Sequence, residues 1–223
     1  MQFKKLVLTA ALTTLPFTGG ALASGHGEPD VGITPEMFMY EGMVNGREVR
    51  IMRDQDTGNT VNPAFALTSR PCPPFCIQPM QLAPGVETIG ELEVIEYVRR
   101  MAEGDETILL IDSRSTDWAM KGTIPGAVNI PWSKLNVDQG GADPLTISEI
   151  LTEQFGAEET DEEDQWDFAN ARTLVMFCNG MWCGQSPTNI LTLLELGYPA
   201  DRIKWYRGGM QAWEILGLNT EMP

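Results

Sequence analysis

The chain has 223 residues, of which 31 are acidic and 15 are lysine or arginine, and its formal net charge is −16. So strong a negative charge repels the phosphates of nucleic acids and the surfaces of anionic membranes, so neither is expected as a partner. The length allows one hydrophobic core with a smaller appended unit. The only histidine is His26, which argues against Cys–His or Ser–His–Asp catalysis and against a histidine-containing metal site.

Residues 1–23 have the three parts of a secretory signal peptide. Lys4 and Lys5 form a positive start, the apolar segment LVLTAALTTLPF follows, and Ala21-Leu22-Ala23 provides a small-residue cleavage site. An uncleaved membrane anchor is the alternative, but the apolar segment is short and is interrupted by threonine and proline. We therefore predict cleavage after Ala23, export to a bacterial periplasm and no membrane span in the mature chain.

We expect residues 24–87 to form a small N-terminal extension that packs on a main domain. The Asn45-Gly46 pair, followed by the segment Arg47–Met52, predicts a β-hairpin with a tight turn. The rest of the extension is rich in turn residues, and its prolines forbid regular structure around Cys72 and Cys76.

Residues 88–223 alternate between helical and strand patterns. A capping box of Thr88 and Glu91 predicts a helix that ends at Gly104, and a second box of Thr146 and Glu149 predicts another that stops at Gly156. The first helix is expected to bury four apolar residues: Leu92, Ile95, Val98 and Met101. The second is expected to bury Ile147, Ile150, Leu151 and Phe155.

Short apolar strands separate these helices. They are predicted at Ile108–Ile111, at Leu174–Phe177 and at Ile203–Tyr206, and a last helix at Met210–Leu216. An acidic, solvated insertion at about 156–170 interrupts the pattern, with Trp166 as its one anchor. Short buried strands alternating with helices predict an α/β fold, with a mostly parallel central sheet and helices on both of its faces.

The clearest chemical signal is Cys178, which directly follows the predicted strand Leu174–Phe177. Ser186 and Pro187 then favour a helix start, and Gly197 favours its end. A cysteine between a strand end and a helix N-terminus has a stabilised thiolate, because the loop amides and the helix dipole favour negative charge. The alternative is an ordinary buried cysteine in the core.

Three segments in this order resemble the rhodanese family of sulfurtransferases, over about residues 87–223. Ile111–Pro131 resembles the first family signature, with Asp112, Arg114 and the Ile-Pro-Gly-Ala sequence at 124–127, and Tyr206–Gly217 resembles the closing signature. The cysteine loop lies between them. The resemblance implies a rhodanese-like fold, Cys178 as nucleophile and carrier of a persulfide, and no cofactor or metal.

The resemblance also assigns roles to the residues around Cys178. The substrate-binding loop that it implies consists of Asn179, Gly180, Met181, Trp182, Gly184, Gln185 and Ser186. Asp112 and Arg114 are expected to support the site through a buried ion pair or hydrogen bonds, and Arg207 to lie with Arg114 near the mouth of the pocket. Trp182 is expected to be a lid or a partner contact.

The chain departs from the family pattern in two places. Thr123 stands where the first signature usually has a histidine, and the cysteine loop has no arginine before Ser186. Without that cation, no side chain of the loop would bind the sulfonate group of thiosulfate, so thiosulfate is expected to be a poor sulfur donor. The pattern Cys178-x-Gly180-x-x-Cys183 resembles a two-cysteine subset of rhodanese-like proteins.

The remaining cysteines leave several readings open. Cys183 is a resolving thiol for Cys178, the partner of Cys178 in a static disulfide, or a small buried residue. Cys72 and Cys76 form either a local disulfide or a second redox pair near Cys178. A zinc site made of all four cysteines is a further alternative, although neither pair has the spacing usual for zinc ligands.

Three functions therefore compete. The first is a periplasmic sulfurtransferase that passes a sulfane sulfur from Cys178 to a thiol or a cyanide-like acceptor. The second is a thiol–disulfide redox protein that uses both cysteine pairs, and the third is a non-catalytic rhodanese-fold binding module. The expected partners are a small sulfane-sulfur donor or a protein persulfide, with a basic periplasmic redox protein as a further candidate because of the negative charge.

Overall fold

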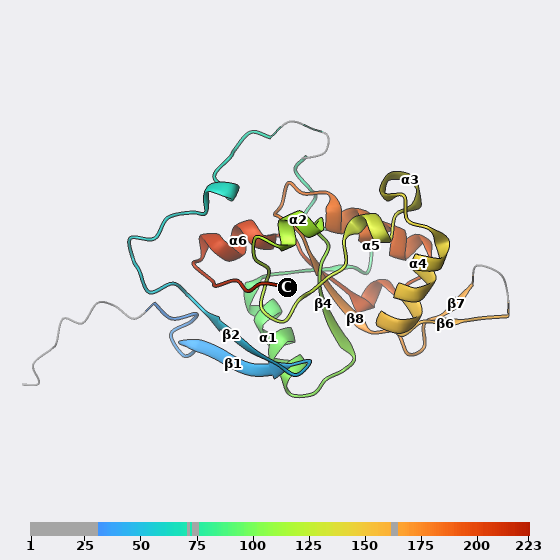
Figure 1. The fold of residues 1–223 in the computed structure, drawn as a ribbon, viewed down its shortest axis with the longest axis horizontal. Helices are drawn as coiled ribbons and strands as arrows, with labels where there is room; N and C mark the ends of the chain where they lie inside the picture. The colour runs from blue at the N-terminus through green and yellow to red at the C-terminus, as the bar shows by residue number, and fades with distance from the viewer. Residues whose placement is uncertain (1–30, 71, 73–75, 162–164) are drawn as a thin grey trace, which may run out of the picture.

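A central parallel sheet organises the computed structural model, which describes residues 31–70, 72, 76–161 and 165–223 (Figure 1). The predicted signal peptide and His26 lie outside the described residues. The strand order is β3-β9-β8-β4-β5, and each neighbouring pair is parallel. The five strands are β3 (Glu87–Ile89), β9 (Ile203–Tyr206), β8 (Thr173–Phe177), β4 (Ile108–Asp112) and β5 (Val128–Asn129).

Helices connect these strands. The α-helices are α1 (Glu91–Ala102), α2 (Thr116–Ala119), α3 (Val137–Gly140), α4 (Pro144–Glu149), α5 (Gln185–Glu195) and α6 (Gly209–Ile215). The short 3-10 helices are η1 (Pro63–Phe65), η2 (Trp132–Lys134) and η4 (Ala200–Arg202), and the π-helix η3 (Ile150–Gln154) continues α4. None of the helices in the described ranges combines the length and the apolar character that crossing a bilayer requires.

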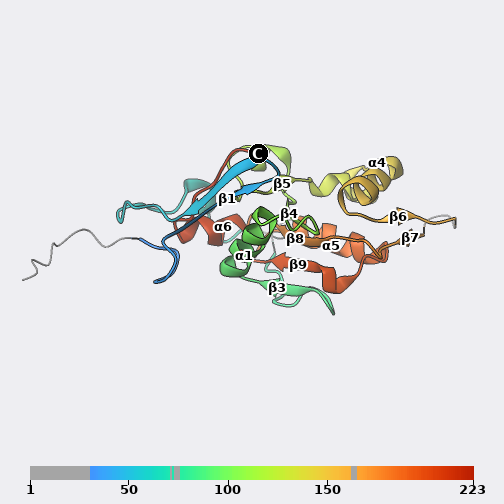
Figure 2. The ribbon, with the colours of Figure 1, turned by 90° about the horizontal axis from the view of Figure 1, so that it is seen from below.

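The sheet has a separate hydrophobic core on each face. On one face, α1 and α6 pack on alternate residues of the central strands, such as Leu110 and Val175. On the other face, α4, η3 and α5 pack on the intervening residues, such as Ile111 and Met176. Figure 2 shows the five strands in order with these helices on their two sides. The predicted α/β fold with a sheet covered on both faces is confirmed.

The N-terminal hairpin lies beside α1 (Figure 1). Strands β1 (Met39–Val44) and β2 (Arg47–Met52) are antiparallel, and Asn45 and Gly46 both have positive φ, of 49° and 76°. That backbone conformation is the one that a two-residue Asn-Gly turn adopts. Val49 and Ile51 are fully buried in the same core as α1 and α6.

The predicted start of the first helix is wrong by two residues. Thr88 belongs to β3, and the helix α1 begins after Gly90, whose N–H donates to Glu93 Oε2 at 2.9 Å. The predicted residues Ile95, Val98 and Met101 are buried. Leu92 is 52% exposed, and Val94, four positions before Val98, lies on the buried face instead. The sequence missed β3 because three residues are too few for a periodicity.

The second helix also has a different cap. Asp143 caps α4, accepting from the N–H of Thr146 at 2.9 Å, and Pro144 occupies the first turn, where no N–H is needed. Thr146 donates its hydroxyl to the same carboxylate instead of capping the helix itself. The predicted buried residues of this segment, Ile147, Ile150, Leu151 and Phe155, are all buried.

The acidic insertion contains a short antiparallel pair, β6 (Glu158–Glu159) and β7 (Trp166–Asp167). Trp166 is partly buried against the core on the α5 side of the sheet, as predicted for the anchor of this segment. The acidic side chains of β6 are exposed.

Candidate functional site

Cys178 directly follows β8, the middle strand of the sheet, as predicted. At the same carboxyl edge of the sheet, Asp112 ends β4 and Tyr206 ends β9, in register with Phe177. Ligands of open parallel sheets bind beyond this edge. The cysteine side chain is only 2% exposed, so any reagent reaches its sulfur only through a small opening or after a local movement.

The first residues of α6 fix the backbone around Cys178. The N–H of Met210 donates to the carbonyl of Cys178 at 3.0 Å, and the N–H of Gln211 donates to the carbonyl of Asn179 at 2.9 Å. Gly209 makes this approach possible. Its φ is +56°, and a Cβ there would overlap the Cys178 carbonyl and lie 2.7 Å from the Gly180 nitrogen.

A fully buried ion pair supports the loop from the side of β4. Arg114 donates to both carboxylate oxygens of Asp112, with its shortest bond from Nη2 at 2.6 Å, and the two side chains are 1% and 0% exposed. The Nη1 of Arg114 lies 3.5 Å from Oδ1 of Asn179, the residue after Cys178. The ion pair therefore joins the end of β4 to the start of the cysteine loop.

Thr123 completes this ion pair. Its hydroxyl donates to Oδ2 of Asp112 at 2.8 Å, and the carbonyl of Gly122 accepts from Arg114 Nη2 at 2.6 Å. At the position where the family pattern usually has a histidine, this chain thus has a neutral donor that satisfies the buried carboxylate.

Cys178 and Cys183 form a disulfide, with their Cα atoms 6.4 Å apart. The segment between them turns back on itself, because the N–H of Cys183 donates to the carbonyl of Gly180 at 2.9 Å. Cys183 is 1% exposed. Among the described residues no cluster of three or more potential metal ligands exists.

The predicted helix cap at Ser186 is wrong. Gly184 is the N-cap and Gln185 the first residue of α5. The turn at Gly180–Cys183 brings the chain into helical geometry earlier, and Pro187 fits the first turn because its missing N–H would have had no helical partner. Ser186 is fully buried, and its Oγ accepts from Nε1 of Trp205 at 3.2 Å.

Trp182 is held between α6 and the N-terminal extension. Its Nε1 donates to Oε1 of Gln211 at 2.7 Å, and Nε2 of the same Gln211 donates to the carbonyl of Phe65 at 3.1 Å. The guanidinium of Arg70 lies over the Trp182 ring, 4.1 Å from its centroid. Sequence reasoning missed Arg70 and Gln211, because nothing local indicates that the extension folds back onto the cysteine loop.

Cys72 and Cys76 form a second disulfide, with Cα atoms 5.0 Å apart. Both line a pocket of about 630 Å³ whose wall also includes Met181 and Trp182 of the cysteine loop. The structure thus places the two cysteine pairs on neighbouring segments. The backbone joins these segments too, because the N–H of Gln78 donates to the carbonyl of Met181 at 2.9 Å.

Arg207 contributes to the same connection. Its guanidinium donates to the carbonyl of Gln78 at 2.7 Å and to that of Pro79 at 3.0 Å. The residue predicted for the mouth of the pocket therefore holds the chain that follows Cys76 against the end of β9. Arg114, predicted with it, is buried.

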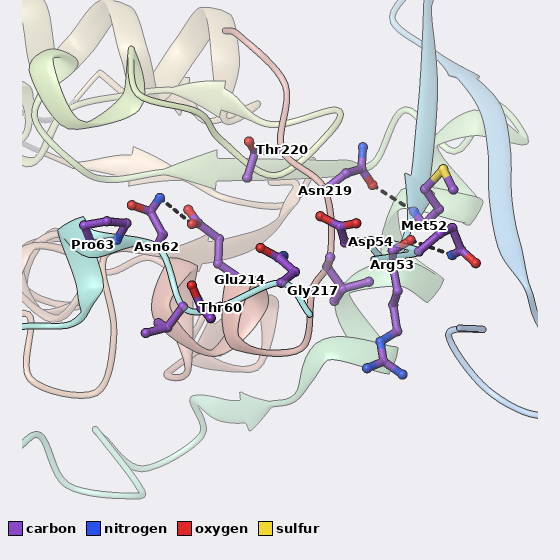
Figure 3. Close-up of a pocket in the computed structure, with 14 residues that line it drawn as sticks. Met52, Arg53, Asp54, Thr60, Asn62, Pro63, Glu214, Gly217, Asn219 and Thr220 are labelled. Atoms are coloured by element: carbon purple, nitrogen blue, oxygen red, sulfur yellow. Dashed lines mark hydrogen bonds between the residues drawn. The ribbon is translucent and has the colours of Figure 1, made fainter. Parts of the chain in front are cut away.

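A larger, more polar pocket of about 710 Å³ lies between the segments 52–63 and 214–220 (Figure 3). The side chain of Glu214 is oriented toward Asn62, whose Nδ2 donates to its carboxylate at 2.6 Å. Burial raises the pKa of Glu214, although the bond from Asn62 and the charge of Arg114 act in the opposite direction. The described residues that line this pocket include none of the cysteine loop, so it is not the site of Cys178 chemistry.

These features make the chain an α/β protein with a cysteine loop at the carboxyl edge of its parallel sheet. A buried Asp–Arg pair and the helix α6 hold that loop in place. The family model described as "Rhodanese-like domain" matches residues 94–216, more than half of the chain. The chain therefore belongs to the rhodanese-like domain family.

Several solved structures are similar to part of the chain at low identity. The human single-domain sulfurtransferase TSTD1 is 25% identical, over 58% of this chain and 96% of that one, with a TM-score of 0.36. SseA of Escherichia coli, described as a 3-mercaptopyruvate sulfotransferase, is 19% identical over 57% and 43% of the two chains, with a TM-score of 0.38. The BH2092 protein of Bacillus halodurans is 19% identical over 57% and 71%, with a TM-score of 0.39. No curated protein matches the chain.

Proposed function

We propose that this chain is a sulfurtransferase in which Cys178 accepts a sulfane sulfur and carries it as a persulfide. The observation that carries the proposal is the setting of Cys178, directly after the middle strand and ahead of the N-terminus of α5. Membership of the rhodanese-like family supports it. The positive end of the eleven-residue helix α5 favours a thiolate and a persulfide anion without a histidine base.

The first step is a transfer between sulfur atoms. Once a dithiol has reduced the Cys178–Cys183 disulfide, the Cys178 thiolate attacks the outer sulfur of a donor R–S–SH, the S–S bond of the donor breaks, and R–S⁻ leaves. Cys178–S–SH remains, and it passes its outer sulfur to an acceptor thiol or a cyanide-like acceptor. No electrons are gained or lost overall, so this route needs no oxidant.

Cys183 provides a second route by which the carried sulfur leaves Cys178. Its thiolate attacks Sγ of the Cys178 persulfide, HS⁻ leaves, and the Cys178–Cys183 disulfide forms. The disulfide geometry of this pair supports the step, because the two cysteines reach each other within the folded loop. A dithiol must then donate two electrons to restore both thiols. We propose a basic redox protein of the periplasm as that reductant, because the chain is strongly negative.

Export to the periplasm is part of the same proposal. Its support is the signal-peptide pattern of residues 1–23. The presence of two cysteine pairs fits an oxidising compartment, where disulfides persist.

A second candidate function is thiol–disulfide exchange without any sulfur transfer. One observation favours it: the Cys72–Cys76 disulfide lines the pocket that Met181 and Trp182 of the other pair also line. In that case the two pairs exchange electrons with a dithiol substrate, and no persulfide forms.

The intact mass of the reduced chain after exposure to polysulfide tests the proposal. The wild type should gain about 32 Da, one sulfur atom, as a persulfide. Cys178→Ser should gain nothing, whereas the matched variant Cys76→Ser should still load. Cys183→Ser should load and then lose the sulfur more slowly than the wild type. Loading that persists in Cys178→Ser and maps to Cys72 would contradict the assignment, and a wild type that never loads would favour thiol–disulfide exchange.

A further inference from the structure

The pocket beside the cysteine loop has an unusual distribution of charge. Its walls are mostly apolar and include Leu67, Ile77, Met181, Ala212 and Ile215. Among the described residues that line it, Arg70 alone is charged. A single cation in an apolar pocket is conspicuous in a chain whose net charge is −16.

The cation is held in a defined place. The Arg70 guanidinium lies over Trp182 at 4.1 Å, within the range of a cation–π contact. Gln211 in turn fixes Trp182 through the bond to Nε1. The carbonyl of Ala64 accepts from Nη2 of Arg70 at 3.3 Å. Because the charge and its aromatic platform are pre-oriented, a ligand would lose less free energy in ordering them.

The surrounding surface is apolar as well. Ile77 is 87% exposed and Ile215 is 64% exposed. The volume of about 630 Å³ falls in the usual range of small-molecule sites, which combine apolar walls with a few placed polar groups. Such a pocket discriminates in favour of a molecule with an apolar body and one anionic group.

We propose that this pocket binds a small organic anion, with its apolar body between Trp182 and Ile215 and its anionic group on Arg70. The site goes beyond the proposed sulfur transfer, because neither Cys178 nor Cys183 is among the described residues that line it. Arg70 supplies, from the N-terminal extension, an anion-binding cation next to a loop that has none of its own.

Fluorescence titration of the full chain with two probes tests this site. The first probe is 8-anilinonaphthalene-1-sulfonate, and the second is the neutral N-phenyl-1-naphthylamine, which has the same aromatic body without the sulfonate. The sulfonate should bind to one saturable site and at least about tenfold more tightly than the neutral probe, because a charge-assisted pair is stronger than a neutral contact. Arg70→Met should abolish that difference and leave the affinity of the neutral probe unchanged. Arg47→Met, which removes an exposed charge on the hairpin, is the matched control and should bind like the wild type.

A second pair of variants locates the site. Ile215→Asp places a negative charge in the pocket, and it should weaken binding of the sulfonate by about tenfold or more. Leu191→Asp, on the exposed side of α5, should not. Equal affinity of Arg70→Met and wild type for the sulfonate, or an equal effect of the two aspartate variants, would overturn the proposal. The titration contains no sulfur donor, so its result is independent of whether Cys178 carries a persulfide.

Discussion

The two cysteine pairs have almost the same spacing and opposite settings. Cys178 and Cys183 are five positions apart, buried, and held by the main chain of α6 and by a buried ion pair. Cys72 and Cys76 are four positions apart, lie in a proline-rich segment, and Cys72 is exposed. Spacing alone therefore does not set the role of a cysteine pair. The elements around it decide how it is reached and how its thiolates are stabilised.

The largest effect is expected from breaking the buried ion pair that supports Cys178. Asp112→Ala leaves Arg114 buried without its partner, and this should lower the free energy of unfolding by about 3–5 kcal/mol. Glu41→Ala breaks the exposed pair with Arg50, and it should cost about 0–1 kcal/mol. Urea denaturation of both variants measures the difference. Equal losses would mean that the buried pair contributes no more than an exposed one.

A smaller loss is expected from a methyl group at Gly209. Gly209→Ala combines a positive φ with overlap onto the Cys178 carbonyl, so it should destabilise the fold by about 2–3 kcal/mol. Gly46→Ala is the control on the hairpin, because its φ is also positive but nothing lies within 4 Å of the added atom. It should cost about 1 kcal/mol. The thermal unfolding midpoints of the two variants report the contrast, which disappears if the close approach to Cys178 is unimportant.

The exposure of the pairs predicts the order in which they are reduced. Under mild reductant, without denaturant, the Cys72–Cys76 disulfide should open faster than Cys178–Cys183, by about tenfold, because attack on a buried sulfur requires local opening. Timed alkylation followed by peptide mass mapping gives both rates. In denaturant the two rates should converge. Faster reduction of Cys178–Cys183 in the native protein would mean that burial does not protect this disulfide from the reductant.

The smallest expected effect is on the pH dependence of stability, and it arises at the contact between the N-terminal extension and α6. The raised pKa of Glu214 means that folding favours its protonated form. Stability should therefore be greatest below the unfolded pKa of this carboxyl and fall as the pH rises through its folded pKa. Glu214→Gln should remove this part of the pH dependence while keeping an acceptor for Asn62. Urea titrations between pH 4 and 7 on both proteins test it, and parallel stability curves would show that Glu214 does not couple to folding.

The sequence predicted those parts of the fold that depend on local pattern. The hairpin turn at Asn45-Gly46, the strand Ile203–Tyr206 and the place of Cys178 after β8 all follow from periodicity and turn chemistry. Helix starts were less predictable. At Thr88 and Ser186 a good capping residue is present, but β3 in one case and the turn at Gly180–Cys183 in the other decide where the helix begins.

The surroundings of the site could be predicted only in part. The Asp112–Arg114 contact follows from a two-residue spacing and a family signature. The positions of Arg70, Gln211 and Phe65 depend on how the extension crosses α6, and no local rule encodes that contact. Thr123 departs from the family pattern in the sequence itself, but its hydrogen bond to Asp112 depends on the three-dimensional fold.

Hydrogen bonds hold both ends of the cysteine loop in place when the redox state of the Cys178–Cys183 pair changes. Before the loop, Cys178 and Asn179 are tied to α6, and after it, the carbonyl of Gly184 accepts from Thr188 in the first turn of α5. Between these two anchors, the carbonyl of Met181 accepts from the N–H of Gln78, and Trp182 donates to Gln211. Opening or closing of the Cys178–Cys183 bond therefore acts first on residues 180–183 and then, through Met181 and Trp182, on the N-terminal extension and α6.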